Sequence, residues 1–136
     1  MPSRPAHLLI AGAVFGAELL IATTFSQVEL VRSFLGDYLV VILLYHLAQA
    51  IRPVAPLRLA IGVFAFSCAV EVSQLFHLAD ALGFRPGGLL YILAGNTFSW
   101  VDLLMYALGC ATAGLVDRLF LRVGASARAS GRGEAS

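Results

Sequence analysis

Four long apolar stretches constrain the fold of this 136-residue chain more than any other feature. They cover residues 7–25, 37–51, 57–76 and 100–121. A helix rises about 1.5 Å per residue, so about 20 apolar residues cross the hydrocarbon core of a bilayer, which is about 30 Å thick. The sequence therefore predicts an all-α membrane protein, a bundle of four transmembrane helices in a single domain over residues 1–123.

Composition agrees with a membrane protein and excludes one class of partner. The chain is 60% hydrophobic and 12% charged, whereas a soluble domain has about 25% charged residues. Its net charge is only +1, and a nucleic-acid-binding surface needs a basic surplus. We therefore expect no DNA or RNA partner.

Two segments outside the predicted helices have distinctive sequences. Residues 85–88, Arg-Pro-Gly-Gly, end any helix, and the apolar run at 89–94 is too short to cross a bilayer. We expect a short interfacial or re-entrant segment before the last helix, and the sequence leaves open whether residues 89–96 re-enter the bilayer. Residues 124–136 are mostly Ala, Ser, Gly and Arg, which predicts a disordered cytoplasmic tail.

The arginines predict the orientation, because cationic loops stay on the cytoplasmic side of a membrane. Arg32 and Arg85 fall on one side of the predicted bundle. The other side, which holds both termini, has Arg4, Arg52, Arg58, Arg118, Arg122, Arg128 and Arg132. We therefore expect a multi-pass protein with both termini cytoplasmic and with the segments at 29–36 and 77–99 facing outward.

Four acidic residues fall at or near membrane depth, where an ionised acid costs about 2.5 to 3.5 kcal/mol. Glu18 falls near the middle of the bilayer, and the helix rise places Glu71 about 8 to 10 Å below the outer boundary. Asp37 and Asp102 begin their predicted helices near that boundary. Because acids outnumber arginines on this side, we expect them to stay protonated or to bind a cation or a hydroxyl-rich ligand.

Helical spacing adds an amide and two phenols to these acids. Gln74 shares a helical face with Glu71, because it follows Glu71 by three positions. Tyr45 and Tyr106 follow the two aspartates along their helices, and we expect both phenols to reach the depth of Glu71. The sequence thus predicts an outward-facing polar pocket with seven ligand-binding candidates: Glu18, Asp37, Tyr45, Glu71, Gln74, Asp102 and Tyr106.

Each acid also has a structural interpretation. Asp37 follows a glycine and has the form of a helix start, and Ser99-x-x-Asp102 has the form of a capping box. Glu71 could make interhelical hydrogen bonds alone, and Glu18 could be a protonated acid bonded to a neighbouring helix. The two cysteines form no metal-ligand motif with the histidines, so we expect no metal and no cofactor.

Small residues predict close packing between helices. Gly12 and Gly16 form a GxxxG step in the first span, and Gly109 and Gly114 lie in the fourth. Such residues let two helix backbones approach in a membrane. We expect these contacts within a compact bundle, and the sequence leaves open a homo-oligomer.

Two segments of the chain resemble a known family. The first contains ELLIA at residues 18–22 and RSFLGDYLVVILLY at 32–45, and the second contains ExxQ at 71–74, LAGNTFSWVD at 93–102 and YxxG at 106–109. Over about residues 10–115 the chain resembles the bacterial integral membrane family called domain of unknown function 2809. Ser99 stands where that family often has Asp. The resemblance implies a multi-pass protein of the bacterial inner membrane.

The second half of the chain is also distantly similar to VanZ-like proteins, which pair an ExxQ helix with a later Asp-led helix. Tyr106 stands where VanZ-like chains usually have Asn. VanZ lowers susceptibility to glycopeptide antibiotics that carry lipid tails. The similarity therefore implies a cell-envelope context.

Several functions are compatible with these features. The one that we favour is binding of a lipid headgroup, a glycolipid or another envelope component in the polar pocket. A small proton-coupled exporter could use Glu18, and a membrane enzyme acting on lipid-linked substrates could use Glu71 or Asp102 as a general base. An assembly factor would need no ligand. The chain lacks a nucleophile elbow, a P-loop and an HExxH motif, which favours a protein that is not an enzyme.

Overall fold

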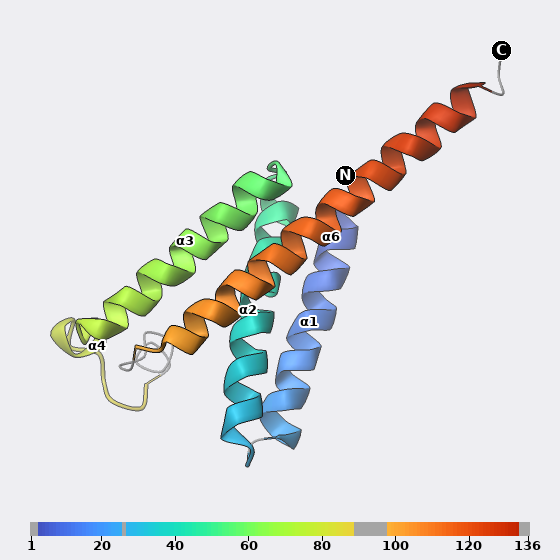
Figure 1. Cartoon of the computed structure of the whole chain (residues 1–136). Coiled ribbons are helices and arrows are strands. Elements are labelled where there is room, and N and C mark those ends of the chain that lie inside the picture. Colours follow the sequence, from blue (N-terminus) through green and yellow to red (C-terminus); the bar gives the residue numbers. More distant parts are fainter. Residues whose placement is uncertain (1–2, 26, 89–97, 134–136) are drawn as a thin grey trace.

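The computed structural model describes residues 3–25, 27–88 and 98–133, and these residues are helical for most of their length (Figure 1). The four long helices are α1 (Arg4–Thr24), α2 (Glu29–Ile51), α3 (Pro56–Leu75) and α6 (Trp100–Gly133), and the short helix α4 (Leu78–Ala81) follows α3. All four long helices have the length and apolar character needed to cross a membrane. The predicted all-α membrane bundle of four spans is confirmed.

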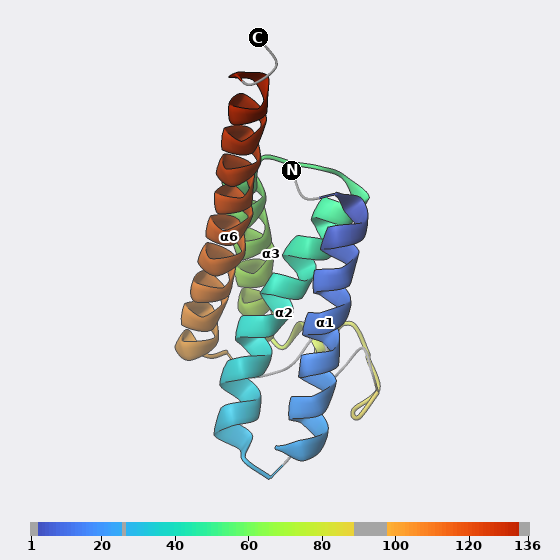
Figure 2. The ribbon, with the colours of Figure 1, turned by 90° about the vertical axis from the view of Figure 1, so that its right-hand side faces the viewer.

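The long helices pack side by side in the order α1, α2, α6, α3. α2 contacts α1 and α6, while α3 packs mainly on α6 and touches α2. Among the described residues no contact joins α1 to α3. Both chain termini lie at one end of the bundle, which we call the terminal end, and the α1–α2 connection lies at the other, the turn end (Figure 2).

α2 begins earlier than the sequence predicted. Its first residue is Glu29 rather than Asp37, so residues 29–36, predicted as an outer loop, form its first two turns. This segment has no proline, and its leucines and arginine favour a helix, as does an acidic residue in the first turn. Asp37 therefore lies in the third turn, and its interpretation as a helix start is wrong.

α6 continues to Gly133, although the sequence predicted a disordered tail from residue 124. Alanine and arginine are strong helix formers, and a helix already begun in the span extends without a new nucleation cost. Its 34 residues reach about 51 Å, well beyond a hydrocarbon core of about 30 Å. Its last turns project past the other helices (Figure 2). Residues 134–136 and the predicted interfacial segment at 89–96 lie outside the described residues.

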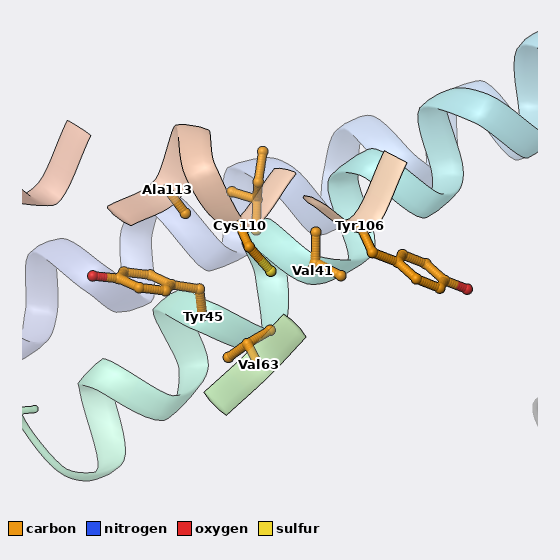
Figure 3. Close-up of a cluster of buried hydrophobic side chains, with 7 residues drawn as sticks. Val41, Tyr45, Val63, Tyr106, Cys110 and Ala113 are labelled. Carbon is orange, nitrogen blue, oxygen red and sulfur yellow. The ribbon is translucent and has the colours of Figure 1, made fainter. Parts of the chain in front are cut away.

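The hydrophobic core lies where α2, α3 and α6 meet (Figure 3). A Cβ atom at Gly109 would lie 2.5 Å from the carbonyl oxygen of Tyr38, and one at Gly114 would lie 3.1 Å from the Cβ atom of Ala60. The predicted close packing through small residues is therefore confirmed for α6. The buried core residues are Val41, Ile42, Tyr45, Val63, Tyr106, Cys110 and Ala113.

The GxxxG step of α1 does not take part in this packing. A Cβ atom at Gly12 or Gly16 would have no atom of the described structure within 4 Å. α1 instead turns its His7 and Ala11 side chains inward, and His7 Nδ1 lies 2.9 Å from His46 Nδ1 of α2. The prediction that Gly12 and Gly16 pack within the bundle is wrong, because they lie on the opposite face of the helix.

Large apolar side chains cover the outer surface of the bundle. Leu9 of α1 is 75% exposed, Ile51 of α2 is 79% exposed and Trp100 of α6 is 77% exposed. Water would solvate such a surface poorly, whereas lipid chains match it. The exposed surface therefore agrees with a position in a bilayer.

Candidate functional site: an acidic cavity between the helices

A cavity of about 1000 Å³ lies among the four long helices toward the turn end of the bundle. α1 and α3, which do not touch, supply opposite walls, and α2 and α6 lie between them. Apolar side chains such as Leu44 and Phe66 make up much of the lining. Its polar residues are Glu18, Arg32, Asp37, Ser67, Ser73, Gln74, Asp102 and Tyr106.

Most of the predicted candidates meet in this cavity. Glu18 comes from α1, Asp37 from α2 and Gln74 from α3, and α6 adds Asp102 and Tyr106. Asp37 and Asp102 are close enough for their carboxyl groups to interact. Residues of four separate helices thus line one cavity.

Two of the cavity's carboxyl groups each have an oxygen that makes no hydrogen bond in the described part of the chain. Oε1 of Glu18 and Oδ2 of Asp37 are buried and have no hydrogen-bond partner in the described part of the chain. Buried polar atoms in proteins nearly always have one. Both oxygens therefore have unused acceptor capacity beside the cavity.

Arg32 also lines the cavity, although the sequence placed it in an outer loop. The early start of α2 brings it into the first turn of that helix, on the same element as Asp37. Within the described residues, Arg32 makes no ion pair, even though Glu18, Asp37 and Asp102 line the same cavity. Positive and negative side chains therefore face one space without neutralising one another.

Glu71 lies next to this cavity but has a different environment. Its side chain is fully buried, Oε1 accepts a hydrogen bond from the Ser99 backbone N–H at 2.7 Å, and Oε2 accepts one from the Tyr106 hydroxyl at 3.4 Å. Ser99 precedes α6, so the carboxyl group sits at the positive end of that helix. This geometry matches the interhelical hydrogen-bonding interpretation of Glu71.

The predicted capping box at the start of α6 forms only in part. Ser99 Oγ accepts a hydrogen bond from the Asp102 backbone N–H at 3.3 Å. The Ser99 N–H, which the acid of a capping box would accept, donates to Glu71 instead. Glu71 thus replaces Asp102 in the cap, and the Asp102 side chain lines the cavity.

Replacing Glu71 with Ala is expected to lower the free energy of unfolding by about 2 kcal/mol, because the Ser99 N–H and the Tyr106 hydroxyl lose their acceptor. Glu71→Gln keeps an acceptor oxygen but loses the charge at the helix end. We therefore expect it to lower the free energy of unfolding by about 1 kcal/mol. Denaturant unfolding of the purified protein in detergent measures both. Equal stability of the Ala variant and the parent protein would contradict the capping role.

Tyr45 lies away from the cavity, contrary to prediction. Figure 3 shows the hydroxyl groups of Tyr45 and Tyr106 pointing in opposite directions, and Tyr45 is not part of the lining. Because α2 begins at Glu29, Tyr45 is 45 − 29 = 16 residues from the helix start, about 24 Å along the axis. It therefore lies too deep to reach Glu71.

Tyr45 belongs to a second polar cluster, with Gln49 and Asp117. The Tyr45 hydroxyl donates to Asp117 Oδ2 at 2.6 Å, and Gln49 Nε2 donates to the same oxygen at 2.9 Å. Gln49 also exchanges two hydrogen bonds with the backbone of Val54, after the end of α2. Asp117 was not a predicted candidate, although an acid inside an apolar run is the same signal that identified Glu18.

The described residues give no support for a metal centre. No group of three or more His, Cys, Asp or Glu side chains among them could hold a metal ion.

The four apolar helices define the described residues as those of a multi-pass, all-α membrane protein. The family described as protein of unknown function (DUF2809) matches residues 26–110. The chain belongs to this family. The matched region contains α2, α3 and the first part of α6, and hence most of the cavity. Neither the curated proteins nor the solved structures give a match.

Proposed function

We propose that this protein binds the polar head of a membrane amphiphile, such as a lipid or a glycolipid, in the acidic cavity. The observation that carries the proposal is the pair of partnerless carboxyl oxygens, on Glu18 and Asp37, inside a hollow of about 1000 Å³. A ligand that donates hydrogen bonds would satisfy both oxygens. Gln74 and Tyr106 add polar groups that orient such a head.

Access from the membrane supports an amphiphile over a water-soluble ligand. α1 and α3 form opposite walls of the cavity without touching one another in the described part of the chain. Leu44 and Phe66 add apolar lining. A polar head could thus enter sideways between α1 and α3 while its acyl chains stay in lipid.

The predicted orientation places this cavity in the outer half of a bacterial inner membrane. Arginines at the terminal end favour cytoplasmic termini, so the turn end would face outward. The distant resemblance to VanZ-like proteins adds an envelope context. The amphiphile would then be a component of the cell envelope.

A proton-coupled exporter is the second candidate function. The specific observation in its favour is Glu18, which lies in a membrane span, lines the cavity and has a partnerless oxygen. Substrate-driven proton movement in proteoliposomes that is lost in Glu18→Gln would favour transport over binding alone.

The test is lipid retention by the purified protein in maltoside detergent, measured by native mass spectrometry with a bacterial polar lipid extract. Asp37→Asn and Glu18→Gln are each expected to weaken retention of the bound lipid about tenfold or more, because each removes a charged acceptor. Glu29→Gln is the matched control, since Glu29 is an exposed acid in the first turn of α2 outside the cavity lining.

Three results would decide the proposal. Weaker lipid retention in Asp37→Asn and Glu18→Gln, but not in Glu29→Gln, supports the proposal. Equal retention by both cavity variants and by Glu29→Gln would mean that the lipid binds the outer apolar surface, and the proposal would fail. Retention of no lipid by the parent protein would also end it.

A further inference from the structure

Ionisable side chains of both signs line the cavity. Arg32 lines it without an ion pair among the described residues. Asp37, on the same helix, has a carboxyl oxygen without a partner, and Asp102 faces Asp37. Arg32 is exposed and Asp37 is partly buried, so side chains of both signs line the same cavity at different degrees of exposure.

We infer that the ligand is zwitterionic, an amphiphile whose headgroup joins a phosphodiester to a primary ammonium. The Arg32 guanidinium takes the phosphate, which it matches with two parallel hydrogen bonds. The Asp37 and Asp102 carboxylates take the ammonium, which has three N–H donors. This inference rests on the proposed function and narrows its ligand class.

The order of the charged residues along α2 gives the orientation of the headgroup. Arg32 is in the first turn, at the turn end, and Asp37 is five residues further along, about 7.5 Å deeper. The phosphate would therefore lie nearer the turn end and the ammonium deeper, beside α6. Glu18 of α1 would face the same ammonium from the opposite wall.

Competing headgroups match this arrangement less well. A neutral sugar can donate to Asp37 but leaves Arg32 and the acids without opposite charges, and uncompensated charge in a membrane is costly. A phosphoglycerol head satisfies Arg32 and leaves the carboxylates. A quaternary ammonium has the correct charge but no N–H donor for the open oxygen of Asp37.

The experiment compares four lipids with identical acyl chains, added singly to the purified full-length protein in maltoside and counted by native mass spectrometry. They are phosphatidylethanolamine, phosphatidylcholine, phosphatidylglycerol and diglucosyldiacylglycerol. We expect phosphatidylethanolamine to bind about tenfold more tightly than each of the others, a difference of about 1.4 kcal/mol.

Two variants test the ammonium contact and the phosphate contact separately. Asp37→Asn is expected to weaken phosphatidylethanolamine binding about tenfold while phosphatidylglycerol binding is unchanged or stronger. Arg32→Gln is expected to weaken both phospholipids and to leave the glycolipid unchanged. Glu29→Gln should match the parent protein. Asp102→Asn replaces Asp37→Asn if the latter does not give a monodisperse protein.

The outcomes distinguish this inference from the proposed function. If diglucosyldiacylglycerol binds most tightly and Asp37→Asn weakens its binding, the inferred zwitterionic headgroup is wrong and the proposed function stands. If Arg32→Gln leaves phosphatidylethanolamine binding unchanged, the phosphate assignment is overturned. If no lipid depends on Asp37, Asp102 or Arg32, both fail.

Discussion

Replacing Gly109 with Ala is expected to destabilise the bundle by about 3 kcal/mol or more, because a methyl group there would meet closer contacts than at any other described glycine. The added Cβ atom would lie 2.5 Å from the Tyr38 carbonyl oxygen and closer still to Cγ2 of Val41. Val41 is fully buried and the carbonyl belongs to the backbone of α2, so neither can move aside. The two helices would have to separate.

The measurement is denaturant unfolding of the purified protein in detergent, with the yield of monodisperse protein as a second reading. Gly62→Ala in α3 is the matched control, because a Cβ atom there has no atom of the described structure within 4 Å. This control should be neutral or gain about 0.5 to 1 kcal/mol from helix propensity. Equal midpoints for the two variants would show that α2 and α6 do not pack closely at Gly109.

The spans were predictable because one physical quantity decides them. Only apolar segments of sufficient length cross a bilayer as helices, and the sequence has four. Helix ends follow weaker preferences. A boundary set by hydropathy stopped at Asp37 because the polar residues before it resemble a loop, whereas the backbone continues the helix back to Glu29. Likewise, the composition of the segment after residue 123 predicted no helix, whereas α6 continues to Gly133.

The grouping of the acids was also predictable in part. The sequence placed Glu18 near the middle of the bilayer and Asp37 and Asp102 near its outer boundary, and all three line the cavity. Rotation of each helix about its axis is not encoded in hydropathy, since every span is apolar nearly all round. Arg32 and Tyr45 were therefore misplaced, because their positions depend on where α2 begins and on which face meets α6.

Packing contacts between distant segments could not be derived from spacing. Asp117 is an acid in an apolar run, but its partners are Tyr45 and Gln49 on another helix. The same holds for Glu71, whose cap on Ser99 crosses from α3 to α6. The sequence identified polar groups that need partners, and the fold decides which partners they receive.

Replacing Asp117 with Ala is expected to lower the free energy of unfolding by about 3 kcal/mol. The Tyr45 hydroxyl and the Gln49 amide both donate to Asp117 Oδ2, and both side chains are almost completely buried, at 0% and 1% exposed. A buried donor that loses its acceptor costs about 1 to 3 kcal/mol. Gln49 keeps its bond to the Val54 carbonyl, so the Tyr45 hydroxyl accounts for most of the loss.

A double-mutant cycle isolates that hydroxyl. Tyr45→Phe alone should cost about 1 kcal/mol, because the bond to Asp117 and a long one from Gln49 Nε2 are lost while the carboxylate retains Gln49. In the Tyr45→Phe background, Asp117→Ala should cost clearly less than in the parent protein, since no orphaned hydroxyl remains. Additive losses would show that Tyr45 and Asp117 do not act as a pair. The proposed lipid binding should persist in folded Tyr45→Phe protein, because Tyr45 lies outside the cavity lining.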